Sequence, residues 1–455
     1  MNALDLGYGV AAVVTAPLWM RKTRSGWAQR FARVVPELPP REPGVSRIML
    51  HAVSVGEVNA LREIVPLLGE HAQVVVTAST DTGFARAQSL FGAQTQQDHR
   101  RHSCSVARFP LDGSWMVSRF LDAVKPDVVG LVELEIWPNF VRACQKRAIP
   151  VAVINGRLSE RSFRGYRRIA RWISPSFTAL SIAAVQNEAY AQRFVDMGVA
   201  ANRCVLTGSM KFDSVQIADD VPGAEKLADA LGIDPSKPLI VAGSTGPGEE
   251  AMLYRIWKEY LRSQGVQLLC APRKPERFDQ AAAALPGCVR RTCPQAKLCT
   301  QKNTTERSNS PESTAVHGSE NRAAASQNGK SSGAGLFLLD TIGELGMAYS
   351  LANIAVVGRS FFDLHGSDPI EPIACGAATI IGPAVSDFTQ IVEQLAHAGG
   401  LLQADRENLG RVLTELLGDV DRQKSMVQAG QKQIRCLQGA SSRHAEILLW
   451  LGHTI

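Results

Sequence analysis

Glu57 is the residue best placed to do chemistry, because its carboxylate lies at a predicted turn between a strand and a helix. It closes the stretch His51-Ala-Val-Ser-Val-Gly-Glu57, in which an apolar β-type run breaks at Gly56 and a helical pattern follows. In a parallel α/β sheet, ligands bind where strands end, and a carboxylate there can take a proton from a hydroxyl. First-turn acids are also common because they interact favourably with the helix dipole, and the residues alone favour this structural interpretation.

Two acids and one lysine follow other predicted strands of the same half. Glu133 and Glu135 lie two residues apart after an apolar run, so they point the same way on an extended chain. Lys211 follows the last strand, where a cation can stabilise negative charge that develops on a leaving phosphate. The alternatives are a pair of helix-start acids beside Pro138 and a solvated surface lysine.

Polar motifs follow four strands of the second half. The turn at 243–250 is rich in glycine and suits a phosphate, although it lacks the lysine of a P-loop. Arg273, beside Pro272, offers a guanidinium to a phosphate, and Glu344 and Glu371 can accept hydrogen bonds from sugar hydroxyls. Taken singly, these motifs are equally typical of a glycine-rich turn, a solvated basic loop and capping acids. Their recurrence at successive strand ends favours a ligand site.

These side chains need a scaffold that brings strand ends together. Apolar runs alternate with helical patterns from Arg47 to Asp213 and again from Pro238 to Gly382, which predicts parallel βαβ units. We therefore expect an α/β fold with two Rossmann-like domains facing across a cleft, an arrangement that suits a glycosyltransferase with a nucleotide-sugar in one half and an acceptor in the other. The predicted boundaries are 1–42 for an N-terminal membrane-associated helix and basic collar, 43–215 for the first domain, 216–235 for a connector, 236–430 for the second domain with a disordered insertion at about 301–335, and 431–455 for a C-terminal helix.

Composition narrows the class of protein. The 455 residues are 45% apolar and 20% charged, which suits two or three globular domains. A net charge of +6 fits an anionic membrane or a phosphorylated substrate, whereas the 6% aromatic content argues against nucleic acid, which needs stacking residues. Nine scattered cysteines without a C-x-x-C pair indicate a reducing compartment and no structural zinc site.

Two segments have the chemistry to contact an anionic membrane. The stretch 6–20 is mostly apolar and is followed by a basic cluster at 21–24, but it is shorter than the ~20 residues of a spanning helix. A shallow anchor and a buried first helix both remain open. A predicted helix face that could meet anionic lipid or a phosphorylated acceptor, or be merely solvated, carries Arg161, Arg164, Arg168 and Arg171.

Together the motifs resemble those of the 3-deoxy-D-manno-octulosonic acid (Kdo) transferases of lipopolysaccharide synthesis. They run in family order over nearly the whole chain, apart from polar insertions at 94–102 and 301–335. The motifs are His51-Ala-Val-Ser-Val-Gly-Glu57, Glu133-Leu-Glu-Ile-Trp-Pro-Asn139, Asn155-Gly-Arg-Leu-Ser-Glu-Arg-Ser162, Gln186-Asn-Glu188, Gly208-Ser-Met-Lys-Phe-Asp213, Pro272-Arg-Lys-Pro-Glu-Arg277, Gly343-Glu344-Leu and Pro369-Ile-Glu371-Pro.

The resemblance implies a GT-B fold and an inverting sugar transfer that needs no metal and no cofactor, with CMP-Kdo as the donor co-substrate. The implied acceptor is the phosphorylated lipid A precursor, lipid IVA, at the cytoplasmic face of the inner membrane. The first domain would bind the acceptor and the second CMP-Kdo. By the family motifs Glu57 is the proton acceptor, and Glu133 and Lys211 stabilise the transition state. The implied CMP-binding residues are Pro272, Arg273, Ile342, Gly343, Glu344, Asp368, Pro369, Ile370 and Glu371.

The sequence departs from the family pattern in the second half. Gly246 replaces a usual histidine, Ile342 replaces a methionine, and Asp368 replaces an asparagine within Leu364-His-Gly-Ser-Asp368-Pro. An aspartate adds negative charge close to the expected nucleotide. Two alternatives therefore stay open: a GT-B transferase with another nucleotide-sugar donor, and a non-catalytic membrane-peripheral protein that binds anionic lipid.

Overall fold

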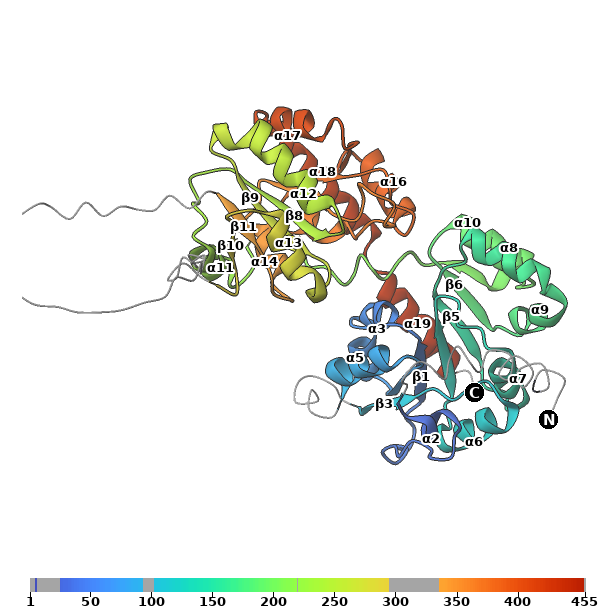
Figure 1. The fold of residues 1–455 in the computed structure, drawn as a ribbon. Helices are drawn as coiled ribbons and strands as arrows, with labels where there is room; N and C mark the ends of the chain where they lie inside the picture. Colours follow the sequence, from blue (N-terminus) through green and yellow to red (C-terminus); the bar gives the residue numbers. More distant parts are fainter. Residues whose placement is uncertain (1–4, 6–24, 93–101, 219, 294–334, 454–455) are drawn as a thin grey trace, which may run out of the picture. The chain divides into compact units, whose positions relative to one another are not determined.

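The computed structural model describes residues 5, 25–92, 102–218, 220–293 and 335–453. The chain divides into two compact units, of which the first comprises Met1–Gln216 with Arg435–Ile455 and the second Ile217–Ile434 (Figure 1). Each unit contains a seven-stranded sheet whose strand pairs are all parallel. The predicted α/β class with doubly wound parallel sheets is therefore confirmed.

The sheet of the first unit has the strand order β3-β2-β1-β4-β5-β6-β7. Its central strands are buried along their whole length because helices cover both faces of a parallel sheet. The order reverses between β1 and β4, which is where α/β sheets bind ligands. The strands are β1 (Arg47–Ala52), β2 (Gln73–Ala78), β3 (Cys104–Arg108), β4 (Val128–Val132), β5 (Val151–Gly156), β6 (Ile182–Val185) and β7 (Cys204–Leu206).

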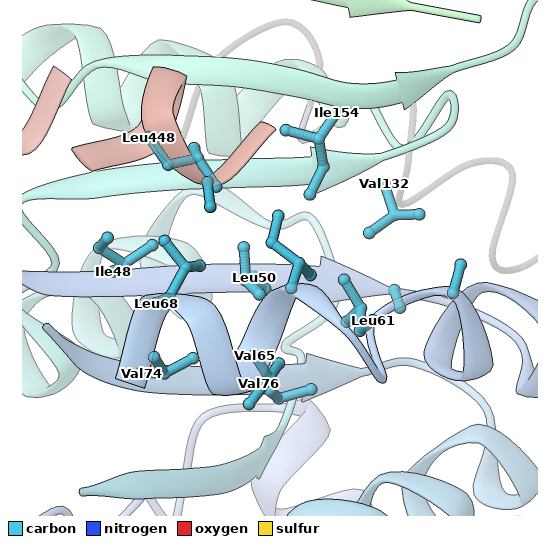
Figure 2. Close-up of a cluster of buried hydrophobic side chains, with 14 of the residues drawn as sticks. Ile48, Leu50, Leu61, Val65, Leu68, Val74, Val76, Val132, Ile154 and Leu448 are labelled. Atoms are coloured by element: carbon cyan, nitrogen blue, oxygen red, sulfur yellow. The ribbon is translucent and has the colours of Figure 1, made fainter. Parts of the chain in front are cut away.

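The helices of the first unit include one from the far end of the chain. Leu448 of the last helix packs with Ile48 and Leu50 of β1 and with Leu61 and Leu68 in one buried cluster (Figure 2). The helices are α2 (Trp27–Arg30), α3 (Val55–Ala60), α4 (Ile64–Gly69), α5 (Asp81–Phe91), α6 (Ser114–Val124), α7 (Pro138–Lys146), α8 (Glu160–Arg168), α9 (Ala170–Thr178), α10 (Glu188–Asp196) and α19 (Ala440–His453).

The second unit repeats this plan. Its sheet has the order β10-β11-β9-β8-β12-β13-β14, so the order reverses between β8 and β12. The strands are β8 (Leu239–Thr245), β9 (Gln267–Pro272), β10 (Val289–Arg290), β11 (Leu336–Leu338), β12 (Ile354–Val357), β13 (Ala378–Ile381) and β14 (Leu402–Gln403). The helices are α11 (Ala224–Leu231), α12 (Glu249–Ile256), α13 (Phe278–Ala284), α14 (Leu345–Ser350), α15 (Ile370–Ala374), α16 (Thr389–His397), α17 (Leu409–Leu417) and α18 (Val420–Leu437).

The structure adds detail to the expected boundaries at two places. The connector 216–235, expected to be helical, contains α11, whose Leu227 and Leu231 are buried in the core of the second unit. The stretch 431–455, expected as one helix, holds the end of α18 and all of α19, because Gly439 adopts a left-handed φ of 93° between them.

Several expectations fall outside the described residues. They concern the apolar stretch 6–20 with its basic collar, the tract 94–101 and nearly all of the insertion at 301–335. Within the described ranges, none of the helices combines the length and apolar character that a membrane crossing requires.

Candidate active site

Glu57 is held in place at the start of α3. Ser54 is the N-cap of this helix, and its hydroxyl donates to Glu57 Oε1 at 2.7 Å. The backbone N–H of Val53 donates to Glu57 Oε2 at 2.8 Å, which completes a contact of the capping-box type. The structural role expected for a first-turn acid is therefore real. It does not exclude chemistry, because each carboxylate oxygen offers a second lone pair.

Glu133 turns the chain out of the sheet at the end of β4. Its backbone N–H donates to Ile154 O at 3.0 Å, which extends the pairing with β5 by one residue. Its φ is +57°, a left-handed conformation that is uncommon for a residue other than glycine and costs free energy. The strand order places this turn beside the end of β1. Glu57 and Glu133 are thus brought to the switch point together.

The electrostatics of the switch point involve a third acid, Glu135. Burial raises the pKa of Glu57, hydrogen bonds from Val53 and Ser54 oppose the rise, and Glu133 adds to it. Burial, followed by repulsion from Glu57 and Glu133, raises the pKa of Glu135 to about 7, although Trp137 Nε1 donates to its Oε2 at 3.1 Å. Glu135 is therefore partly protonated near neutral pH. The two-residue spacing noted in the sequence was the signal for this group, but Glu135 was not among the predicted catalytic residues.

Lys211 lies in the turn that follows the edge strand β7. Three strand spacings of about 5 Å separate β7 from β4, so the turn must fold back to approach Glu133. It does so, because the backbone N–H of Met210 donates to Asn155 Oδ1 at 3.1 Å, and Asn155 lies on β5 next to β4. The lysine itself is half-buried. The turn therefore lies over the carboxyl ends of the strands.

In the second unit the structure brings Arg273, Asp368 and Glu371 together. The backbone N–H of Arg273 donates to Thr245 O at 3.1 Å, which ties the loops after β9 and β8. Burial and the Asp368 carboxylate raise the pKa of Glu371, whereas the Arg273 guanidinium lowers it. A Cβ atom on Gly346 would lie 3.2 Å from Glu371 Oε1, so α14 closely approaches this acid. A cation and two carboxylates thus share one site.

The segment Ile342–Glu344 begins with two exposed residues and ends with a carboxylate that is already engaged. Glu344 accepts from Arg291 Nη2 at 3.0 Å and from the hydroxyl of Thr341. Although burial raises the pKa of Glu344, these contacts lower it below its usual range overall. Ile342 is 67% exposed, and Gly343 has a φ of 94°. A ligand at this turn therefore meets the exposed residues 342–343.

Asp368 has a structural function where the family pattern has asparagine. Its Oδ1 accepts from the backbone N–H of Ile370 at 3.0 Å at the start of α15. Pro369 lies between them as the N-cap residue. Asparagine and aspartate can both accept this bond, so the local turn is compatible with either residue.

Sequence reasoning missed two buried glutamates at the second switch point. Glu249 is fully buried, and its carboxylate accepts backbone N–H bonds from the loops after β8 and β12. The donors are Gly246 at 2.8 Å, Arg359 at 2.6 Å and Phe361 at 3.1 Å. The adjacent Glu250 forms a 2.9 Å ion pair with Arg277 Nη2. These acids therefore shape the turn at 243–250. The only signal for this in the sequence is that two neighbouring glutamates directly follow the glycines.

The predicted arginine face is wrong in one respect. Arg161, Arg164 and Arg168 are exposed on α8, but this helix ends at Arg168 and Arg171 belongs to α9. The break comes at Ile169, whose φ and ψ of −116° and 19° are not helical. Two large apolar side chains lie exposed beside the arginines, Ile169 at 49% and Trp172 at 61%. The surface is thus both basic and apolar.

Possible metal ligands are dispersed. In the portions of the chain that the structure describes, no three His, Cys, Asp or Glu side chains are grouped so that they could hold an ion.

Comparison with known proteins gives consistent matches. A family model described as 3-deoxy-D-manno-octulosonic-acid transferase (kdotransferase) matches residues 25–214. The 3-deoxy-D-manno-octulosonic acid transferase of Bordetella pertussis is 28% identical over 464 residues, which cover 98% of this chain and 97% of the relative. The enzyme of the same name from Haemophilus influenzae is 27% identical and covers 89% and 87%.

Solved structures with low sequence identity show the fold. The UDP-GlcNAc 2-epimerase of Neisseria meningitidis is 12% identical, covers 89% of this chain and 99% of its own, and has a TM-score of 0.55. Anabaena HepE, solved with UDP and glucose, is 12% identical, covers 88% and 98%, and has a TM-score of 0.54. The predicted fold class, α/β of the GT-B type with two Rossmann-like domains, is confirmed.

Proposed function

We propose that the chain is a Kdo transferase, as its similarity to the Kdo transferase family model and to enzymes of that name indicates, and that it moves Kdo from CMP-Kdo to lipid IVA, the precursor of lipid A. It is a glycosyltransferase of lipopolysaccharide biosynthesis. One observation carries the proposed chemistry: Glu57, Glu133 and Glu135 gather at the switch point of the first sheet, where the pKa of Glu57 is raised toward that of a useful base.

In the proposed reaction Glu57 removes the proton from an acceptor hydroxyl. The hydroxyl oxygen attacks the anomeric carbon of Kdo, the bond from that carbon to the phosphate oxygen breaks, and CMP leaves. Attack opposite to the leaving group makes the transfer inverting. Positive charge develops on the sugar and is stabilised by the Glu133 carboxylate, and Lys211 stabilises the negative charge on the departing phosphate.

The proposed donor site lies at the strand ends of the second unit. Arg273 offers charge-assisted hydrogen bonds to the phosphate, and Glu371 accepts from ribose hydroxyls. The exposed residues 342–343 contact the nucleotide. No metal or cofactor takes part in the proposed chemistry. The full proposed set for CMP is Pro272, Arg273, Ile342, Gly343, Glu344, Asp368, Pro369, Ile370 and Glu371.

The proposed place of action is the cytoplasmic face of the inner membrane. The exposed arginines of α8 suit the phosphates of lipid IVA and of anionic lipids. Trp172 and Ile169 supply the apolar contact that favours the membrane–water interface. The proposed association is peripheral or through the N-terminal segment.

A transfer assay tests the proposed function. The full chain is incubated with CMP-Kdo and lipid IVA in vesicles, and products are identified by mass spectrometry. We expect Glu57→Gln to slow transfer by about 10²–10⁴-fold, since the variant lacks the general base. Glu63→Gln, which alters an exposed acid close to α4, should match the parent. Equal rates for Glu57→Gln and the parent would remove Glu57 as the base.

A binding measurement separates the alternatives. CMP should raise the unfolding temperature of the full chain, and UDP should not. Protection by UDP alone would indicate another nucleotide-sugar donor, which the Asp368 substitution makes worth testing. Vesicle binding without protection by either nucleotide would indicate a non-catalytic lipid-binding protein.

A further inference from the structure

The last helix of the chain is bound to the turn that carries Lys211. The Asp213 carboxylate accepts the backbone N–H of Gly439 at 2.6 Å and that of Ser441 at 2.5 Å, so it caps the start of α19. Arg443 Nε donates to Thr207 O at 2.9 Å at the other end of the turn. These contacts join segments more than 220 residues apart. The turn and α19 therefore form one piece of structure.

His444 of α19 reaches further, into the core beneath the turn. The backbone N–H of Asn155 donates to His444 Nε2 at 3.1 Å. Because Nε2 accepts this bond, the neutral ring carries its proton on Nδ1. Burial, with a smaller contribution from Arg443, lowers the pKa of His444 to about 3, so the ring stays neutral through the physiological range.

Asn155 connects His444 to the turn through a second hydrogen bond. It is fully buried on β5, and its Oδ1 accepts the backbone N–H of Met210 at 3.1 Å, one residue before Lys211. The turn needs such an anchor, because β7 is a three-residue edge strand whose Val205 and Leu206 are 39% and 50% exposed. The sheet by itself constrains the turn little.

We propose that Asn155 is a positioning residue for Lys211 and that His444, brought in by α19, fixes Asn155. The inference rests on the proposed function, in which Lys211 stabilises the leaving phosphate. A lysine side chain is long and flexible, so the place of its ammonium depends on where its backbone is held. A displacement of about 1 Å at a reacting group can cost ~10²-fold in rate. In this proposal α19, at the end of the chain, contributes to catalysis through the position of Lys211.

Asn155→Gly is the sharpest variant. The φ of Asn155 is +52°, a conformation that glycine adopts without strain, so the substitution removes the amide and adds no steric conflict. We expect kcat to fall by about 10-fold or more, with a much smaller change in KM for CMP-Kdo, since the contact to Met210 acts on the transition state. In a Lys211→Ala background, adding Asn155→Gly should lower kcat by less than about 2-fold, because the lysine side chain that Asn155 positions is already absent.

Leu448→Ala is the matched control for stability. Leu448 is fully buried in α19, so its truncation should lower the unfolding temperature at least as much as Asn155→Gly does. Its effect on kcat should be the same with and without Lys211. At the second position, His444→Gln, which retains an acceptor, should preserve more of kcat than His444→Leu.

The outcomes distinguish the two proposals. If Lys211→Ala equals the parent in rate, the assigned role of Lys211 fails and the positioning role fails with it. Suppose instead that Lys211→Ala slows transfer and that Asn155→Gly lowers the rate by the same factor in the Lys211→Ala background as in the parent. In that case only the positioning role is overturned. Amide hydrogen exchange at Met210 provides a reading without turnover. Asn155→Gly should accelerate exchange at 209–212, and an unchanged rate there overturns the inference even if the parent transfers no Kdo.

Discussion

Glu57 is hydrogen-bonded to the backbone N–H of Val53, and Glu133 leaves β4 at the position that the β1–β4 register aligns with Val53. His51 pairs with Leu131, so two residues later Val53 and Glu133 leave the sheet side by side. Two carboxylates are therefore held by neighbouring strand ends, and their mutual repulsion contributes to the raised pKa of Glu57.

Glu135 should shape the pH dependence of transfer. The group is faced by Glu57, Glu133, Trp137 and Tyr166, and its pKa of about 7 gives the site a titration near neutrality. Glu135→Gln removes the group that titrates near neutrality, whereas at lower pH Glu135 is already protonated and adds no charge beside Glu57. We therefore expect the kcat/KM profile to lose its component near pH 7. A component near pH 7 that persists in Glu135→Gln, with Glu63→Gln as the reference, would contradict this assignment.

Glu135 should also affect folding stability in a defined pH window. Its folded-state pKa of about 7 lies above the ordinary 4.5, so between these values the folded protein keeps a proton that the unfolded chain has released. The free energy of unfolding should therefore fall as pH rises through this window. We expect Glu135→Gln to remove roughly 1–2 kcal/mol of that fall. Denaturant titrations at pH 5 and pH 7.5 measure it, and equal slopes for variant and parent would count against it.

Gly246, one of the positions where the chain departs from the family pattern, packs against Leu364. A Cβ atom on Gly246 would lie 2.5 Å from Leu364 Cδ1. Gly246→Ala should therefore destabilise the second unit by about 1–3 kcal/mol through overpacking. In a Leu364→Ala background, Gly246→Ala should lower the free energy of unfolding only slightly. The effects of the two substitutions on urea unfolding should therefore not be additive. Gly165→Ala on α8, where a Cβ meets nothing within 4 Å, is the unstrained control and should not destabilise the protein.

The buried ion pair of the second unit should be costly to break. Arg277 and Glu250 side chains are 13% and 2% exposed, so Arg277→Met leaves a buried carboxylate without its cation. We expect a loss of about 3–5 kcal/mol. Arg411→Met breaks the exposed Arg411–Glu415 pair and should cost about 0.3–0.5 kcal/mol. Similar losses in the free energy of unfolding for both variants, measured by denaturant titration, would show that burial does not determine how much an ion pair contributes. Only Arg277→Met should also weaken CMP binding. Arg277 Nη1 donates to Thr245 O, which also accepts the backbone N–H of Arg273 in the proposed donor site.

The strands that sequence reasoning found and missed differ in burial. β1, β2, β4 and β5 are buried along their whole length, and such apolar runs stand out in a sequence. β3, an edge strand with three half-buried residues in five, was missed, although the more exposed edge strand β7 was found. β10 and β14 were missed because two residues carry no recognisable pattern.

The sequence by itself determined the α/β class and the acids and cations that follow the strands, because hydrophobic periodicity and turn residues are local signals. Only the tertiary structure decided which strand ends are neighbours. It placed Glu133 beside Glu57, engaged Glu344 with Arg291, and returned α19 so that His444 supports Asn155. These contacts join residues 53 to 289 positions apart. Their energies depend on burial and on partners supplied by other elements, which no local pattern records.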